Sequence, residues 1–278
     1  MVEIGINSNN ECGITPAQKF EMIRKSGFNT VMISAKDGDL ETNIVQAKMA
    51  GLSVPVVHLS SHYSDDLWVR GETNERYVAN ILNEIEICGK YNIPFAVMHA
   101  SVGNPSKMII TLNDHGLFCM QKILNHAEKH NVKIALENVD NTNIKRVETL
   151  LDAFDSKWLG FCFDVGHYYL FKTTTDLMKK YSDRLFVLHL HDNLMDYEYG
   201  FDTTRDLHLL PFDGVIDYDK VCRKIAIYGL SAIPIIEVHK IAVGEPRLYK
   251  EMSDFEFLTE AYKRVQRLNE NINKYRKV

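Results

Sequence analysis

The sequence predicts a single (β/α)8 barrel that spans residues 1–278. Short apolar runs rich in β-branched residues alternate eight times with longer segments of helical period. Such alternation is typical of a parallel sheet whose strands are joined by helices. The length also fits, because a barrel of this class takes about 250 residues. A doubly wound open sheet would alternate as well. It is the minor alternative, because eight units occur and no glycine-rich turn follows the first strand.

The expected strands and helices follow in order along the chain. The strands are the apolar runs 3–7, 30–34, 54–59, 95–99, 133–137, 159–164, 185–191 and 233–238. The helices are the segments 16–26, 41–51, 74–92, 113–131, 143–154, 174–183 and 217–229, with a last one over about 253–274. Pro16 suits the first turn of a helix, and Gly27 and Gly51 suit the position just past a helix end. This punctuation agrees with the periodicity.

Composition and charge exclude several classes of protein. Apolar residues make up 45% of the chain and charged residues 25%, which excludes a disordered or fibrous chain. The net charge of −5 does not favour nucleic acid as a partner. No run of 18 apolar residues occurs, and the first residues form neither a basic nor an apolar segment, so we expect no membrane span and no signal peptide. The five cysteines form no C-x-x-C pair, which favours reduced thiols in a cytoplasmic protein.

Polar residues gather at the carboxyl ends of the third to the eighth expected strand. In a (β/α)8 barrel these ends meet at one mouth, where the active site lies. Alone, a histidine at such a position is usually a hydrogen-bonded structural residue, and a carboxylate can cap the next helix. The pattern as a whole is more informative. It consists of His58, His99, Glu137, Asp164 with His167, His189 with His191, and Glu237.

Together these side chains predict a divalent metal ion. Buried carboxylates and imidazoles are costly unless they are protonated, paired or bound to metal. A donor set without thiolates suits Mn²⁺, Zn²⁺, Co²⁺ or Fe²⁺, and Mg²⁺ is less favoured as imidazoles increase. His189 and His191 face the same side of their strand, so both can reach the site, or His191 orients a ligand instead. Cys162 is expected to be a buried apolar residue deeper in the barrel.

The strand-end motifs resemble those of the xylose isomerase-like TIM barrels. This superfamily contains sugar and sugar-phosphate isomerases and epimerases, inosose dehydratase-type enzymes and endonuclease IV. The resemblance covers essentially the whole chain. Its most specific pieces are Asp-x-x-His at 164–167 and His-Leu-His-Asp at 189–192. The others are Ala-Leu-Glu-Asn at 135–138, Asp-Leu-His-Leu-Leu-Pro at 206–211, Gly-Val-Ile-Asp at 214–217 and Ile-Glu at 236–237.

Resemblance to the epimerase branch implies one metal ion held by Glu137, Asp164, His189 and Glu237. The two glutamates would exchange protons with the carbon next to a carbonyl, on opposite sides of a sugar, and the metal would stabilise the enediolate. His167 would contact a substrate oxygen. The leading expectation is therefore a metal-dependent isomerase or epimerase of a small sugar, keto sugar or sugar derivative. A related lyase or dehydratase would pass through the same enediolate and share the site.

Resemblance to the endonuclease branch implies a different enzyme, a three-zinc phosphodiesterase acting on abasic DNA. Its nine ligand positions are matched by His58, His99, Glu137, Asp164, His167, His189, Asp206, His208 and Glu237. Three departures make this the runner-up. The acidic segment 192–206 would repel a phosphodiester, segment 139–144 lacks glycine, and Phe212 replaces a glycine of the family's Pro-Gly-x-Gly turn. A metal-stabilised binding protein without catalysis is a third alternative.

Loops after the strands supply candidate substrate contacts. Trp68 and Arg70 follow the third strand and could close over a sugar, although Trp68 packed onto the barrel is an equal alternative. Lys240, Lys172 and Arg205 are candidate anchors for an anionic group, or solvated charges. The aromatic side chains between 192 and 215 could stack on a sugar or form a homo-oligomer contact; they are Tyr197, Tyr199 and Phe201.

Overall fold

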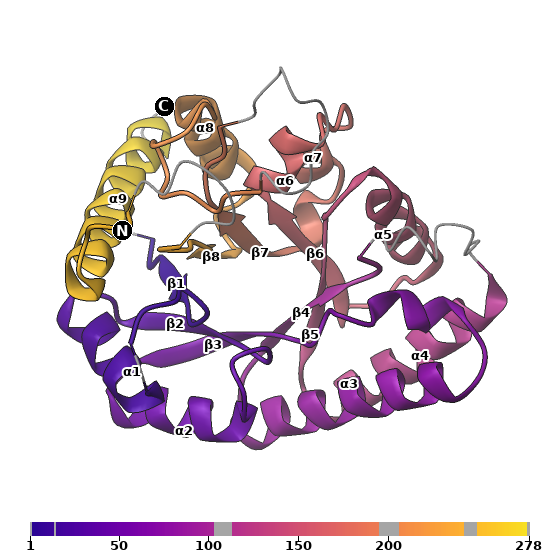
Figure 1. The fold of residues 1–278 in the computed structure, drawn as a ribbon. Coiled ribbons are helices and arrows are strands. Elements are labelled where there is room, and N and C mark those ends of the chain that lie inside the picture. Colours follow the sequence, from indigo (N-terminus) through magenta and orange to yellow (C-terminus); the bar gives the residue numbers. More distant parts are fainter. Residues whose placement is uncertain (1, 14, 103–112, 195–205, 242–248, 277–278) are drawn as a thin grey trace.

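The chain forms a closed barrel of eight parallel strands, in the order in which they occur in the sequence (Figure 1). The computed structural model describes residues 2–13, 15–102, 113–194, 206–241 and 249–276. Each strand pairs with the next, and β1 closes the barrel against β8. The predicted (β/α)8 barrel is confirmed. The strands are β1 Gly5–Asn7, β2 Thr30–Ser34, β3 Ser53–His58, β4 Phe95–His99, β5 Lys133–Glu137, β6 Leu159–Asp164, β7 Leu185–Leu190 and β8 Ile233–Ile236.

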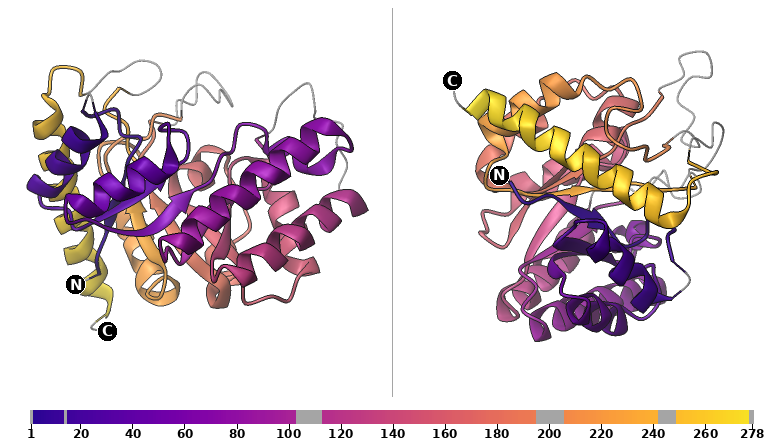
Figure 2. Two further views of the ribbon diagram at one scale, coloured as in Figure 1. Left: turned by 90° about the horizontal axis from the view of Figure 1, so that it is seen from below. Right: turned by 90° about the vertical axis from the view of Figure 1, so that its left-hand side faces the viewer.

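Helices surround the barrel on its outer face (Figures 1 and 2). The α-helices are α1 Pro16–Lys25, α2 Leu40–Met49, α3 Glu72–Lys90, α4 Asp114–Lys129, α5 Asn141–Ala153, α6 Val165–Leu170, α7 Leu177–Lys180, α8 Tyr218–Tyr228 and α9 Asp254–Arg276. Short 3₁₀ helices cover Ser64–Trp68 and Ser182–Arg184. Within the described residues, no helix combines the length and apolar character that crossing a membrane requires.

The helix starts follow from their capping residues. Thr15 accepts a hydrogen bond from the Gln18 backbone and Gln18 bonds back to the Thr15 backbone, which is a capping box ahead of Pro16. Asp140 accepts two backbone N–H groups at the start of α5. These short polar side chains satisfy donors that the first turn of a helix leaves unpaired.

One connection differs from the expectation. A single helix over 174–183 was predicted, but the chain instead forms α6, α7 and a 3₁₀ turn between β6 and β7. The cause lies at the end of β6, where Asp164 Oδ1 accepts the His167 backbone N–H at 2.6 Å and starts a helix at once. Asp164 therefore caps the next helix, which is the alternative given above for a carboxylate at a strand end. Its side chain also faces the barrel mouth.

The core has two apolar compartments. One lies between the strands and the surrounding helices and includes most buried aliphatic residues. The other fills the inside of the barrel with one side chain from each of seven strands, namely Met32, Val56, Val97, Ala135, Cys162, Val187 and Ile235. Cys162 is thus a small buried apolar residue, as expected, and burial raises the pKa of its thiol to about 12.

Candidate metal centre at the barrel mouth

A polar layer lies directly above the apolar layer inside the barrel. Because side chains alternate along a strand, the residue two positions on points the same way, one layer nearer the carboxyl end. Each of the seven interior apolar residues is followed at this spacing by a polar residue. These are Ser34, His58, His99, Glu137, Asp164, His189 and Glu237. The strand register therefore brings the predicted site residues into one ring.

Glu137 contacts three histidines of this ring. Its Oε2 atom is 3.1 Å from His58 Nε2 and 2.9 Å from His99 Nε2, and its Oε1 atom is 3.0 Å from His189 Nδ1. The carboxylate is only 1% exposed. Burial disfavours its charge, but the His189 and His99 imidazoles outweigh burial and hold the pKa of Glu137 well below its usual value. Glu137 is therefore an ionised group surrounded by imidazoles.

Four of the expected metal ligands form a compact group, which we call the inner cluster: Glu137, Asp164, His189 and Glu237. One donor atom from each lies within 4.8 Å of the others. His189 Nδ1 is 2.9 Å from Glu237 Oε2 and 3.7 Å from Asp164 Oδ2. All four side chains are buried. Three carboxylates around one imidazole match the donor chemistry of a divalent cation, which would neutralise charges that are otherwise costly to bury.

A second group, the outer cluster, consists of His167, His191, Asp206 and His208. Asp206 Oδ2 lies 2.7 Å from His167 Nε2 and 3.2 Å from His208 Nε2. His191 Nε2 reaches back to Asp164 Oδ1 at 3.0 Å, whereas its Nδ1 is buried with no hydrogen-bond partner among the described residues. His191 thus orients an inner-cluster carboxylate and also presents a ring nitrogen to the outer cluster.

The outer cluster is charged in the metal-free chain. Burial of the His208 imidazole lowers its pKa, but the Asp206 carboxylate outweighs burial and raises the pKa to about 9. The Asp206 pKa is held well below its usual value, because the His208 and His167 imidazoles more than offset its burial. The pair is therefore an ion pair at neutral pH.

His58, His99 and Glu137 form a third group with metal-ligand spacing. His58 Nδ1 donates to the Leu59 carbonyl at 2.9 Å, so Nε2 is the nitrogen presented to Glu137. This group shares Glu137 with the inner cluster. Together with the outer cluster, the groups contain all nine ligand positions implied by the endonuclease resemblance, with His191 in addition.

Two residues that the sequence analysis did not single out support these clusters. Asn138 donates to the Asp164 carbonyl and accepts the Asp164 N–H, both at 2.8 Å, and its own carbonyl accepts from His167 Nδ1 at 3.0 Å. His239 stacks on His208 with ring centroids 4.7 Å apart. His239 is two positions beyond Glu237, so period-two alternation was the signal that could have found it.

The segment that carries Asp206 and His208 is fastened to the barrel by Asp192. This buried carboxylate accepts the backbone N–H groups of Phe212 at 3.1 Å and of Ile216 at 3.0 Å. Phe212 has φ of +76° and occupies the third position of a turn closed by the Asp213 N–H and the Leu210 carbonyl. The chain therefore keeps the left-handed backbone that a glycine would favour there.

The candidate substrate contacts have different surroundings. Trp68 is 2% exposed, and its indole N–H donates to the Ala100 carbonyl at 2.7 Å, so the packed alternative is the one observed. Lys240 pairs with Asp254 at 2.6 Å. Arg70 is exposed at the surface. Lys172 lies at the end of α6, whereas Tyr197, Tyr199, Phe201 and Arg205 lie outside the described residues.

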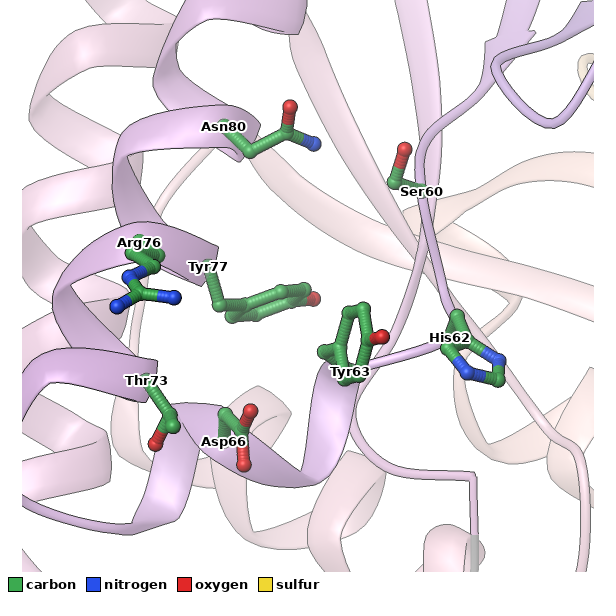
Figure 3. Close-up of a pocket in the computed structure, with 8 residues that line it drawn as sticks. All are labelled: Ser60, His62, Tyr63, Asp66, Thr73, Arg76, Tyr77 and Asn80. Atoms are coloured by element: carbon green, nitrogen blue, oxygen red, sulfur yellow. The ribbon is translucent and has the colours of Figure 1, made fainter. Parts of the chain in front are cut away.

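A separate hollow lies between the connection after β3 and helix α3 (Figure 3). Its volume is about 520 Å³. The Glu84 carboxylate holds the connection against α3, since it accepts the Ser60 N–H at 2.9 Å and an Asn80 amide N–H at 2.7 Å. The Tyr63 and His62 rings contact each other edge-on at the rim, 4.5 Å apart. These exposed rings are the aromatic groups of this loop that face solvent, in contrast to Trp68.

Fold and site together define a (β/α)8 barrel with a histidine- and carboxylate-lined mouth suited to divalent metal. The family model for the xylose isomerase-like TIM barrel matches residues 20–260, and the chain belongs to this family. Two curated relatives are the uncharacterized proteins y4fM of Sinorhizobium fredii and MJ1311 of Methanocaldococcus jannaschii. They are 29% and 28% identical over 154 and 158 residues. Each match covers 52% of this chain. It covers 47% of y4fM and 51% of MJ1311, so the chain spans about half the length of these relatives.

Several solved structures share the fold along their whole length. D-psicose 3-epimerase from Clostridium cellulolyticum H10 superposes with a TM-score of 0.78 at 12% identity, covering 98% of this chain and 99% of that one. The IolI protein with a bound zinc atom gives 0.73 at 17% identity, with 99% of both chains covered. The 3-keto-D-glucoside 4-epimerase YcjR of E. coli gives 0.70 at 14% identity, covering 97% and 100%. At these identities the likeness concerns the fold.

Proposed function

We propose that this protein is a metal-dependent isomerase or epimerase of a small sugar, keto sugar or sugar derivative. The observation that carries the proposal is the placement of two buried glutamates beside the same nitrogen of one imidazole. Glu137 Oε1 and Glu237 Oε2 lie 3.0 and 2.9 Å from His189 Nδ1. Two carboxylates facing one small volume suit removal of a proton from carbon and its return from another direction.

The inner cluster fits a resident divalent ion. Glu137, Asp164, His189 and Glu237 would hold it, with Mn²⁺, Zn²⁺ or Co²⁺ favoured over Mg²⁺ because an imidazole is among the donors. Such an ion, when bound, polarises a substrate carbonyl and lowers the energy of the neighbouring carbanion. The zinc atom bound in the similarly folded IolI protein supports this assignment.

The proton steps fall to the two glutamates. Burial is outweighed by His189 at both residues, so the pKa of each glutamate is well below its usual value and both are ionised at rest. One glutamate takes the proton from the carbon beside the carbonyl, which gives the enediolate. For inversion, the other glutamate must first take up a proton from solvent and then donate it to the opposite face of the carbon, while the first glutamate releases its proton to solvent. His167, whose Nε2 atom lies 2.7 Å from Asp206 Oδ2, would orient a substrate oxygen.

The substrate class rests on the family and on what its neighbours act on. Structures of the same fold include D-psicose 3-epimerase, L-ribulose 3-epimerase and 3-keto-D-glucoside 4-epimerase. A small polyhydroxylated ketone suits a mouth lined by imidazoles and carboxylates, which can accept and donate hydrogen bonds to several hydroxyl groups.

Solvent exchange tests the proposal directly. A panel of ketoses, keto sugars and glycosides is incubated in D₂O with protein loaded with Mn²⁺, Co²⁺ or Zn²⁺, and deuterium at the carbon next to the carbonyl is followed by NMR. The proposal expects exchange and a changed sugar in at least one case, both lost in Glu137→Gln. A product that has lost water would assign the lyase or dehydratase alternative. Exchange that persists in Glu137→Gln would contradict the proton-transfer role.

A three-zinc phosphodiesterase is the second candidate, and the outer cluster favours it. Asp206 bridges two imidazoles, and nine matching ligand positions fall into three groups of metal-ligand spacing. This candidate expects nicking of an abasic duplex and DNA binding that weakens as salt increases. Absence of DNA binding by zinc-loaded protein at low salt would remove it.

A further inference from the structure

We propose a second, peripheral metal site between helices α3 and α4, formed by Glu86, His126 and His130. The two histidines lie one turn apart on the same side of the end of α4, and the glutamate comes from the neighbouring helix. One donor atom from each residue lies within 4.8 Å of the others. Residues four apart on a helix face the same direction, so two such imidazoles are a ready-made chelating pair.

Two ring nitrogens in this group lack partners. Nε2 of His126 and Nε2 of His130 are shielded from water, and neither has a hydrogen-bond partner among the described residues. The Leu82 carbonyl of α3 lies close to the His126 ring. Buried polar atoms without partners call for an explanation.

Helix α3 passes close to His130 at this point. A Cβ atom on Gly89 would lie 2.8 Å from His130 Cβ, so only glycine lets α3 pass the imidazole so closely. The His126 and His130 rings are 4.4 Å apart. Glu86 and His130 also line a solvent-open hollow of about 740 Å³, which gives an ion an entry path.

The site is remote from the barrel mouth. Helices α3 and α4 end here, just before β4 and β5 begin, so the group lies at the amino ends of the strands. In this fold class that end contributes stability, and catalysis is found at the other end. Two imidazoles and one carboxylate suit Zn²⁺, Co²⁺, Ni²⁺ or Cu²⁺, with water completing the coordination. The ion would join α3 to α4 and stabilise the barrel without taking part in turnover.

Metal counting with matched variants tests the site. Zn²⁺ is titrated calorimetrically into the wild-type protein, Glu86→Gln and the double variant His126→Asn/His130→Asn. Glu128→Gln, an exposed carboxylate on the same helix, and His62→Asn, an exposed histidine elsewhere, are controls. We expect the double variant to bind one equivalent fewer than wild type and the controls to bind the same number. Glu86→Gln should weaken that equivalent by about tenfold, within the range typical of altered ligand shells.

Imidazole NMR supplies a readout independent of stoichiometry. Signals of His126 and His130 should shift on Zn²⁺ addition in wild type. In addition, Cu²⁺ at this site should give a nitrogen-coupled EPR component that the double variant lacks, beside the signal of Cu²⁺ bound at the barrel mouth in both proteins. Equal stoichiometry in wild type and double variant, or unshifted signals from both rings, would overturn the proposal. Should the double variant not fold, an unchanged affinity in Glu86→Gln would overturn it instead.

Discussion

The inner and outer clusters use the same residue types but are built in different ways. The inner cluster sits on β5, β6 and β7 and just past β8, and its side chains are 0–9% exposed. The outer cluster takes two of its four members, Asp206 and His208, from the connection after β7. The Asp206 side chain is 21% exposed, and His208 has φ of +46°. Strands fix donors through register and packing, whereas a connection fixes them only through added hydrogen bonds. The more rigid inner cluster is therefore the better candidate for the proposed chemistry, with the outer cluster in a supporting role.

The largest expected effect is the loss of turnover when a glutamate of the inner cluster is replaced. Glu137→Gln and Glu237→Gln should each lower kcat by at least about a thousandfold, because each removes a group that moves a proton. Asp206→Asn should cost about ten- to a hundredfold, since Asp206 acts through His167 and His208. Turnover by deuterium exchange measures all three, with Glu75→Gln on the exposed face of α3 as control. A larger loss in Asp206→Asn than in Glu137→Gln would reverse the assignment.

Replacing Asn138 tests whether hydrogen bonds that position the metal ligands affect metal affinity. Its side-chain amide pairs with the Asp164 backbone, and its backbone carbonyl accepts from His167 Nδ1. Asn138 therefore contacts one member of each cluster. Asn138→Ala should weaken metal binding by about tenfold or more, with no change in the donor set. Competition with a chelating dye measures the affinity. Asn138→Asp keeps the acceptor to the Asp164 N–H but turns a carboxylate oxygen toward the Asp164 carbonyl, so it should weaken the affinity at least as much as alanine. Unchanged affinity in both variants would contradict the positioning role.

Proton release on metal loading tests the charge of the outer cluster. The pKa of His208 is raised to about 9 by Asp206, so its contribution to stability is complete below about pH 6.5, the ordinary histidine value, and is lost as pH rises through 9. Metal needs the neutral imidazole, so filling the outer cluster at pH 7 should release at least one proton. Calorimetry in buffers of different ionisation enthalpy measures it. Asp206→Asn should release fewer protons, and equal release would contradict the ion pair.

The smallest effect concerns the turn that supports the outer cluster. Phe212 has a left-handed backbone but packs its ring on Tyr218, at 4.9 Å, and under the Arg267 guanidinium, at 3.9 Å. Phe212→Ala loses the packing and keeps the strain, whereas Phe212→Gly loses both. The glycine variant should therefore be more stable to unfolding than the alanine variant by about 1 kcal/mol. Denaturant titration measures the difference, and an equal or lower stability of the glycine variant would contradict the strain.

The strands of the barrel could be predicted from the sequence because each is a short buried run of apolar, often β-branched residues. The observed bounds of β2, β4, β5 and β6 match the predicted ones, and β7 and β8 end within two residues of theirs. The prediction was incomplete for the connection after β6. Asp164 caps α6 where a loop was expected, and segment 174–183 forms only the short helix α7 followed by a 3₁₀ turn. A capping hydrogen bond of this kind depends on where the strand ends, which periodicity gives only to within a residue or two.

The candidate site was predictable where strand register alone sets it. Two-residue alternation along neighbouring parallel strands is enough to place Glu137, Asp164 and His189 in one layer. The role of Trp68 could not be decided in the same way, because its burial depends on Gly116 of α4, where a Cβ atom would lie 2.2 Å from the indole. Asn138 acts through contacts between distant segments, which spacing along one strand does not reveal, whereas the two-residue spacing from Glu237 was a signal for His239.

Metal content of the mouth tests the central claim most directly. Divalent metal is determined by elemental analysis in chelator-free, untagged protein carrying His126→Asn/His130→Asn, so that the peripheral site does not contribute. In that background the account predicts at least one ion per chain, lost in Asp164→Asn and retained in Asp206→Asn. A second or third zinc ion that disappears in Asp206→Asn would fill the outer cluster and favour the phosphodiesterase. Protein without metal, or full retention of metal in Asp164→Asn, would contradict the inner cluster as the metal centre.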